Sequence, residues 1–278
     1  MTTVQKIIKY LAVAFAIFLS VSIITGICSA LFTFANIFIG DKEEGIVTNQ
    51  NIESNFSGIS VNLSAAELEI KTGDKFTVET NHKYLKCEEK DDILKISETR
   101  PPFASHPRGM KIILTVPKES TFDYVDISAG AGSVTIDELL ANSLSVELGA
   151  GELKAGRLDA LDKAEIDGGA GSVTINAGQL NNADIDMGIG ELNLTSGLSG
   201  KSSIDYGVGE TNLVLIGEDD DYKIELDKGI GEARLAGKKM SDDSVYGAGK
   251  NFIEIDGGIG ELNITFKAKT DEKEIDVK

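Results

Sequence analysis

The sequence predicts an all-β protein: a right-handed parallel β-helix, or β-solenoid with 19–20-residue coils, preceded by one N-terminal transmembrane helix. Three observations predict this. A ten-residue pattern containing Gly-x-Gly recurs seven times between residues 127 and 264, each copy ends in alternating apolar and polar residues, and residues 10–40 carry no charge. Repetition at a nearly fixed spacing indicates stacked coils, alternation indicates half-buried strands, and an uncharged run of this length can cross a bilayer.

Residues 1–40 are predicted to form a cytoplasmic stub and a transmembrane anchor. Lys6 and Lys9 precede the uncharged run, and three acidic residues follow it at positions 41, 43 and 44. Because positive charge favours the cytoplasmic side, we expect a single-pass protein of the cell membrane, with a cytoplasmic N-terminus and an extracytoplasmic C-terminal domain. The alternative is a cleaved signal peptide, whose apolar core is usually only about 7 to 15 residues long.

Composition excludes several classes of function. The chain has 45 acidic and 27 basic residues, which gives a net charge of −18. Such a surface repels phosphate backbones, so nucleic-acid binding is not expected. The chain has 2 His, 2 Cys and no Trp, and the usual acid, base and nucleophile types are therefore scarce. We expect no catalytic residue and no cofactor.

Residues 41–126 are predicted to form irregular N-terminal strands that cap the solenoid. Short β-like runs such as FTVET and KIILTVP are separated by turn residues. The stretch VNLSAAELEI at residues 61–70 looks like a degenerate copy of the repeat, with Ser64 and Ala66 where the glycines would be.

Residues 127–266 hold the repeats, of which IDMGIGELNL at residues 185–194 is representative. Its ten positions are numbered 1 to 10 below. Positions 1, 8 and 10 are mostly apolar and are predicted to face a shared core. Position 5 is apolar too, so the in-and-out alternation must slip near the second glycine, and we interpret that slip as a corner. Structural corners are therefore predicted at the paired glycines Gly130 and Gly132, Gly149 and Gly151, Gly169 and Gly171, Gly188 and Gly190, Gly207 and Gly209, Gly229 and Gly231, and Gly258 and Gly260.

The paired glycines could also suggest a phosphate-binding loop. A dinucleotide fingerprint needs a third glycine three residues on and a helix behind it. The third position holds Thr, Lys, Asn or Arg in the seven copies, and the following residues alternate like a strand. A nucleotide cofactor is therefore not predicted.

Carboxylates recur at two positions of the repeat. Position 2 holds Asp167, Asp186, Asp205, Asp227 and Asp256, and position 7 holds Glu191, Glu210, Glu232 and Glu261. If these rows align, a solvated acidic face is favoured over a ladder of divalent-cation sites. No metal site is predicted.

The spacing of the first glycines is 19, 20, 19, 19, 22 and 29, so an insertion at residues 236–250 precedes the last copy. This insertion is expected to bulge from the solenoid, and insertions in repeat proteins often contact partners. Its candidate partner-contact residues are Lys238, Lys239, Tyr246 and Lys250; the alternative is a tolerated insertion without function. Residues 267–278 are predicted to form a charged tail.

The repeat unit, together with VNLSAAELEI, YLKCEEKDDILKIS and KIILTVP, resembles the bacterial putative-adhesin domain family of β-solenoids over residues 52–266. The resemblance implies a right-handed parallel β-helix without known catalytic residues. It favours a membrane-anchored, adhesin-like binding or scaffolding module of the bacterial cell surface, whose partner would be a surface protein or a glycan.

Two other functions remain open. The chain could be an accessory or regulatory protein of an envelope-stress signalling system, in which case its partner would be a membrane signalling protein. A polysaccharide-active β-helix enzyme is less favoured, because the acids follow the repeat instead of forming a local cluster.

Overall fold

The computed structural model describes residues 48–51, 56–99 and 109–269. These residues form a 15-stranded sheet and one short 3₁₀ helix, and the all-β prediction is thus confirmed. The predicted transmembrane anchor at residues 1–40 lies outside the described residues. Within the described ranges, no helix is long and apolar enough to cross a membrane.

The elements follow in the order β1 (Thr48–Asn51), β2 (Gly58–Gly73), β3 (Thr77–Thr80), β4 (Leu85–Lys90), β5 (Ile93–Glu98), β6 (Lys111–Pro117), β7 (Thr121–Ile175), β8 (Gly178–Asn181), β9 (Ala183–Ser199), β10 (Lys201–Ile216), η1 (Asp219–Asp221), β11 (Tyr222–Asp227), β12 (Ile230–Leu235), β13 (Lys238–Lys239), β14 (Ser244–Gly247) and β15 (Asn251–Lys267).

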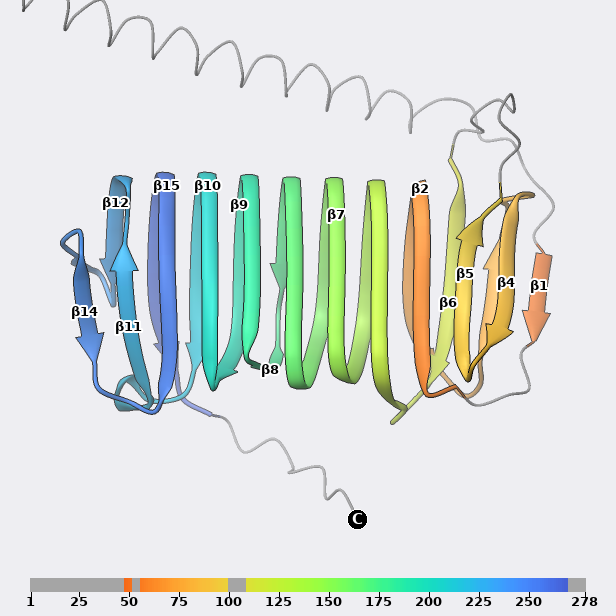
Figure 1. Cartoon of the computed structure of the whole chain (residues 1–278), viewed down its shortest axis with the longest axis horizontal. Coiled ribbons are helices and arrows are strands. Elements are labelled where there is room, and N and C mark those ends of the chain that lie inside the picture. Colours follow the sequence, from red (N-terminus) through yellow and green to blue (C-terminus); the bar gives the residue numbers. More distant parts are fainter. Residues whose placement is uncertain (1–47, 52–55, 100–108, 270–278) are drawn as a thin grey trace, which may run out of the picture. The chain divides into compact units, whose positions relative to one another are not determined.

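The long strands are bent rungs that lie side by side in parallel (Figure 1). Equivalent residues of neighbouring copies are paired: Ile166 with Ile185, and Ile185 with Ile204. The degenerate copy in β2 joins the same array, because Ala66 pairs with Gly132 as predicted. Each rung thus uses its neighbours to satisfy its backbone hydrogen bonds. The right-handed winding stays a prediction.

The core is a column of apolar side chains that runs through the rungs. Position 1 is at most 3% exposed in every copy, and position 10 is at most 5% exposed. Position 3 is also buried where it holds Met187 or Tyr206. The apolar side chains of one rung are covered by the rungs on either side of it. A single rung therefore has no core of its own, and the core forms only when the rungs stack.

The last two copies do not follow the order of the sequence. β15 pairs with β10 on one side and with β11 and β12 on the other. The seventh copy therefore lies between the fifth and the sixth. A stack built in chain order would instead place the seventh copy after the sixth, so the order at this end differs from the order of the repeats in the sequence. The insertion does not bulge freely either: β13 pairs with β12, and β14 pairs with β11, both antiparallel.

Antiparallel strands close the N-terminal end of the sheet. β1 pairs with β3, β3 with β6, and β4 with β5. Beneath them Phe76 packs edge-on against Phe56 and Phe122, with ring centroids 5.3 and 6.2 Å apart. These aromatic rings cover the end of the apolar column.

Candidate functional site

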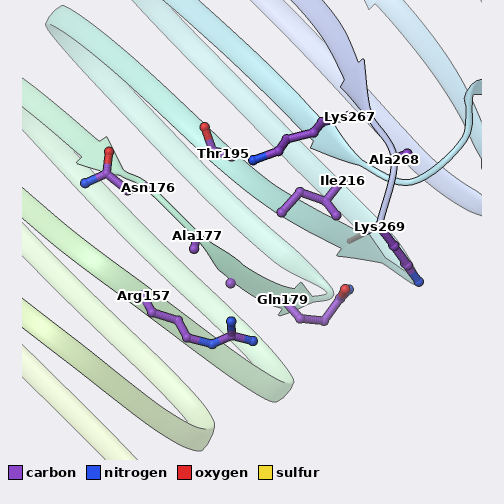
Figure 2. A pocket seen from close by; sticks show the side chains of 10 residues that line it. Arg157, Asn176, Ala177, Gln179, Thr195, Ile216, Lys267, Ala268 and Lys269 are labelled. Atoms are coloured by element: carbon purple, nitrogen blue, oxygen red, sulfur yellow. The ribbon is translucent and has the colours of Figure 1, made fainter. Parts of the chain in front are cut away.

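Each coil has one half that holds the glycine pair and one half that does not. A groove lies on the face formed by the halves without glycine pairs. It encloses about 290 Å³. Figure 2 shows the side chains around it, with Lys267 and Lys269 coming from the C-terminal end of β15 and the residues that follow. The full lining consists of Arg157, Asn176, Ala177, Gly178, Gln179, Thr195, Ile216, Lys267, Ala268 and Lys269.

The wall opposite the lysines is held in place by an ion pair. The Arg157 guanidinium donates to the Asp159 carboxylate through Nε at 2.5 Å and through Nη2 at 3.3 Å. Asp159 is only 9% exposed, and it also accepts a hydrogen bond from the Gln179 backbone N–H at 2.8 Å. A charged pair with a third donor fixes the start of β8 against β7. The wall is therefore ordered before any ligand arrives.

A second hollow, of about 320 Å³, continues the groove, because Gln179, Ile216 and Lys269 line both. It adds Asn181, Asn251 and the insertion residue Lys250, together with one carboxylate, that of Asp221. Within the described residues, Lys250, Lys267 and Lys269 make no ion pair with a carboxylate. The two hollows thus concentrate ammonium and amide groups on a chain whose net charge is −18.

The chemistry of this groove is that of binding. Its cations attract anions, and its amides donate to and accept from hydroxyl groups. The Asp159 carboxylate behind it is bonded to Arg157 and Gln179, and the Asp221 carboxylate, which lines the second hollow, accepts a hydrogen bond from the Glu218 backbone N–H at 3.1 Å. No nucleophile lies beside a base among the residues that line it.

The predicted glycine pairs all lie at a bend of the rungs, on the side of the solenoid away from the groove. In each copy the second glycine has a positive φ, from 127° at Gly132 to 158° at Gly260. At Gly190, φ is 141° and an added Cβ would overlap the Gly171 carbonyl oxygen. At Gly188 an added Cβ would overlap the Gly169 carbonyl oxygen, so the backbones of adjacent rungs touch at this edge.

The carboxylate rows are aligned. Asp186 pairs with Asp167 and with Asp205, and Asp256 pairs with Asp205 and with Asp227. Burial, and then the nearby Asp186 carboxylate, raise the pKa of Asp205 to about 6. Burial likewise raises the pKa of Asp186. The row of position 2 is therefore electrostatically strained near neutral pH.

An amide ladder lies beside the second acidic row. Asn212 donates to Asn193 at 3.0 Å, and Asn263 donates to Asn212 at 3.2 Å. Asn193 and Asn212 also donate to the Glu of their own rung. Such side-chain ladders tie successive rungs together.

The four candidate partner-contact residues do not share one site. Lys250 lines the second hollow of the groove. Lys238, Lys239 and Tyr246 line another hollow, of about 280 Å³, between β13 and β14. There Lys239 pairs with Glu232 at 3.3 Å, and Tyr246 stacks on Phe266 at 6.2 Å and donates to Asp219. Their role as partner contacts stays a prediction.

A buried polar cluster in the N-terminal strands was not predicted. Ser64 donates to Glu98 through its backbone N–H and through its hydroxyl, at 3.2 and 2.7 Å. The His82 Nε2 lies 3.5 Å from the same carboxylate. Burial alone would raise the pKa of Glu98, but the nearby His82 imidazole and the hydrogen bonds from Ser64 outweigh it and lower the pKa to about 2. The cluster joins β2 and β5 to the loop between β3 and β4, and its residues are too far apart in sequence to form a motif.

The described part of the chain contains no cluster of side chains that could form a metal site. No group of three His, Cys, Asp or Glu side chains there could hold a metal ion. The groove residues were also not predicted, although the run from Asn176 to Asn182, with four amide side chains and one glycine, could have drawn attention to this half-coil.

Comparison with known proteins places this fold in context. Residues 56–278 match the family described as Toastrack DUF4097. No curated protein matches the chain at a significant level. Among solved structures, a "putative cell adhesion protein" of Clostridium sporogenes is similar at 20% identity and a TM-score of 0.34, over 80% of this chain and 99% of that chain.

Two further solved structures are similar. A "putative adhesin" of Bacteroides fragilis has 14% identity and a TM-score of 0.38, over 80% of this chain and 98% of that chain. Another, of Parabacteroides distasonis, has 17% identity and a TM-score of 0.36, over 81% and 98%.

Proposed function

The chain belongs to the Toastrack DUF4097 family, and on this premise we propose that it is a non-catalytic binding module of the bacterial cell surface. Residues 1–40 would anchor it in the cell membrane, and the solenoid would lie outside the cytoplasm. In this proposal the groove contacts an anionic polymer, such as a polysaccharide that carries carboxylates.

The observation that carries the proposal is the distribution of charge. The chain has a large excess of acid, yet Lys250, Lys267 and Lys269 line one continuous groove together with Arg157. Arg157 adds a guanidinium group to this lining, beside its ion pair with Asp159. Asn176 and Gln179 would supply amide groups for hydrogen bonds to sugar hydroxyls, whereas the Asn181 amide is bonded to Leu161 and Ser199. The groove is shallow and shared by several rungs, which suits an extended chain better than a compact substrate.

The proposal is tested by titrating full-length protein in detergent micelles with polygalacturonate, a linear anionic polysaccharide. We expect saturable binding that weakens as salt is added, since exposed charge pairs are screened. Reversing two charges in K267E/K269E should weaken binding at least tenfold. Lys118 lies exposed in the turn between β6 and β7, so K118E is the control for the same change of charge elsewhere.

Two results would contradict the proposal. One is the absence of saturable binding to polygalacturonate together with binding of neutral dextran. The other is binding that K118E weakens as much as a single substitution in the groove, because the polymer would then respond only to net charge. Release of reducing ends from the polymer would instead indicate an enzyme.

A further inference from the structure

An apolar ridge runs along the edge at which the rungs bend. It consists of the position-5 residues of the four C-terminal rungs, Ile189, Val208, Ile259 and Ile230, which are paired in that spatial order. Val208 is 36% exposed, Ile259 47% and Ile230 70%. The sequence placed these apolar residues at a corner, and the structure shows that the corner turns them toward solvent.

Exposed large hydrophobic side chains are concentrated on this ridge. Six large hydrophobic side chains are exposed in the described residues, and three of them belong to the ridge. In the earlier rungs the same row holds only alanines: Ala65, Ala131, Ala150 and Ala170. Aligned apolar surface of this kind commonly marks an interaction site.

Carboxylates flank the ridge on both sides. Position 2 lies on the arm that enters the bend, position 7 lies on the arm that leaves it, and both hold an acid in all four rungs. Of these eight carboxylates, within the described part of the chain, only Glu232 forms an ion pair with a Lys or Arg. The flanking acids are Asp186, Asp205, Asp256 and Asp227 on one side, and Glu191, Glu210, Glu261 and Glu232 on the other.

This charge pattern selects among the occupants of an apolar ridge. A second copy seated ridge to ridge would set carboxylate rows against carboxylate rows, which costs free energy. An anionic lipid surface would meet the same repulsion. A polypeptide with an apolar stripe between two rows of Lys or Arg would instead complement both the ridge and its flanks.

The spacing of the ridge favours a helix over a strand. Neighbouring rungs lie about 4.8 Å apart, so four ridge residues span about 14 Å. An apolar helix stripe advances about 5.4 Å per turn, or about 16 Å over three turns. Side chains on one face of a strand repeat at about 6.8 Å and would span about 20 Å. Of the two, only the helix has a repeat close enough to the rung spacing for its apolar side chains to contact all four ridge residues.

We propose that the ridge formed by Ile189, Val208, Ile259 and Ile230 is a docking surface for a basic amphipathic helix of a partner protein. The surface lies on the bend that holds the glycine pairs, and it is formed by other residues than the cationic groove. It therefore does not depend on the proposed polysaccharide binding. The glycine pairs serve this site directly, because they bring the backbones of adjacent rungs close enough to align the ridge.

The test uses full-length protein and a fluorescent synthetic peptide of 18 residues, with Leu at one helical stripe and Lys on both sides of it. We expect saturable binding that weakens with salt. V208S/I259S should weaken it at least tenfold without lowering the melting temperature by more than a few degrees, because both side chains are exposed. L161S is the matched control: Leu161 is also 47% exposed but lies half a coil away from the glycine pairs.

Three results would overturn the proposal. A scrambled peptide of equal charge that binds as tightly would show attraction by charge alone. Equal binding by V208S/I259S and the unsubstituted protein would remove the ridge from the interface. Self-association in sedimentation that V208S/I259S abolishes, with no peptide binding, would assign the ridge to a second copy of the chain.

Discussion

Gly260 pairs with Gly209 on one side and with Gly231 on the other, although Gly231 precedes it in sequence by a whole repeat. The final copy thus fills a place between two copies that come earlier in the chain. β11 and β12 obtain their parallel partner only from β15, and their outer edges are covered by β14 and β13. The sixth copy therefore depends on residues that follow it.

Truncation after Leu235 should release more than the residues it removes. Without β13, β14 and β15, neither β11 nor β12 has a strand to pair with. We expect amide protons of residues 222–235 to lose their protection from hydrogen exchange, while those of β7 keep theirs, because solenoid stability is built from neighbouring interfaces. Deletion of residues 270–278, which leaves β15 whole, is the control. Protection of 222–235 in the truncated chain would contradict the observed rung order.

The repeat pattern predicts the register of the rungs but not the order of the last two. The register of Ile185 against Ile166 and Ile204 was predictable, because a slip by one residue would turn the apolar column outward. The position of β15 was not, since the copies at 226 and 255 share one pattern and either could pair with β10. Only the spacing of 29 residues hinted at it.

The candidate site was not predicted either, because its residues lie outside the repeated pattern. The groove is lined by Arg157, Gln179 and Lys267, which lie in the half-coils between the glycine pairs. These half-coils show little repetition, so no pattern aligns them. The exposure of Val208 and Ile259 was also not predicted. The sequence indicated a corner at the glycine pairs but not whether the residue between the two glycines faces the core or the solvent.

Gly190→Ala should strongly destabilise the solenoid. Its φ of 141° is unfavourable for a residue with a Cβ, and the added atom would overlap the Gly171 carbonyl oxygen. Strain and steric overlap together should cost about 3 kcal/mol or more. Gly237→Asn is the control: that glycine has a φ of 77° with open space around it, and Asn tolerates this region. Thermal unfolding followed by circular dichroism measures both, and equal melting temperatures would contradict the role of the bend.

Ser64→Ala should weaken the cap in a pH-dependent way. The pKa of Glu98 lies at about 2, below its usual 4.5, so its hydrogen bonds stabilise the fold fully above pH 4.5. That stability is lost as the pH falls toward 2. Removing the hydroxyl should therefore cost about 2 kcal/mol at pH 7, and the difference from the unsubstituted protein should shrink in acid.

Melting temperatures measured from pH 7 to pH 2 check this expectation. Ser57→Ala is the control, since the Ser57 hydroxyl donates to the Asp92 backbone carbonyl and not to a carboxylate. A loss that stays constant across the range for Ser64→Ala would mean that its bond to Glu98 contributes no titratable stability.

Asp205→Asn should stabilise the protein at neutral pH. Burial and the neighbouring Asp186 raise the pKa of Asp205 to about 6, above its usual 3.8. A raised carboxyl pKa means that the folded state holds its proton more tightly than the unfolded chain does, so stability falls as the pH rises from about 4 through 6. Asparagine removes this loss. After allowance for solvent screening, the gain should be about 1 kcal/mol at pH 7 and should vanish below pH 4. Asp137→Asn, an exposed site outside the aligned row, controls for the loss of one negative charge. A lower melting temperature of Asp205→Asn at pH 7 would contradict this expectation, and destabilisation of the unsubstituted protein by a chelator would then indicate that bound cations balance the aligned carboxylates.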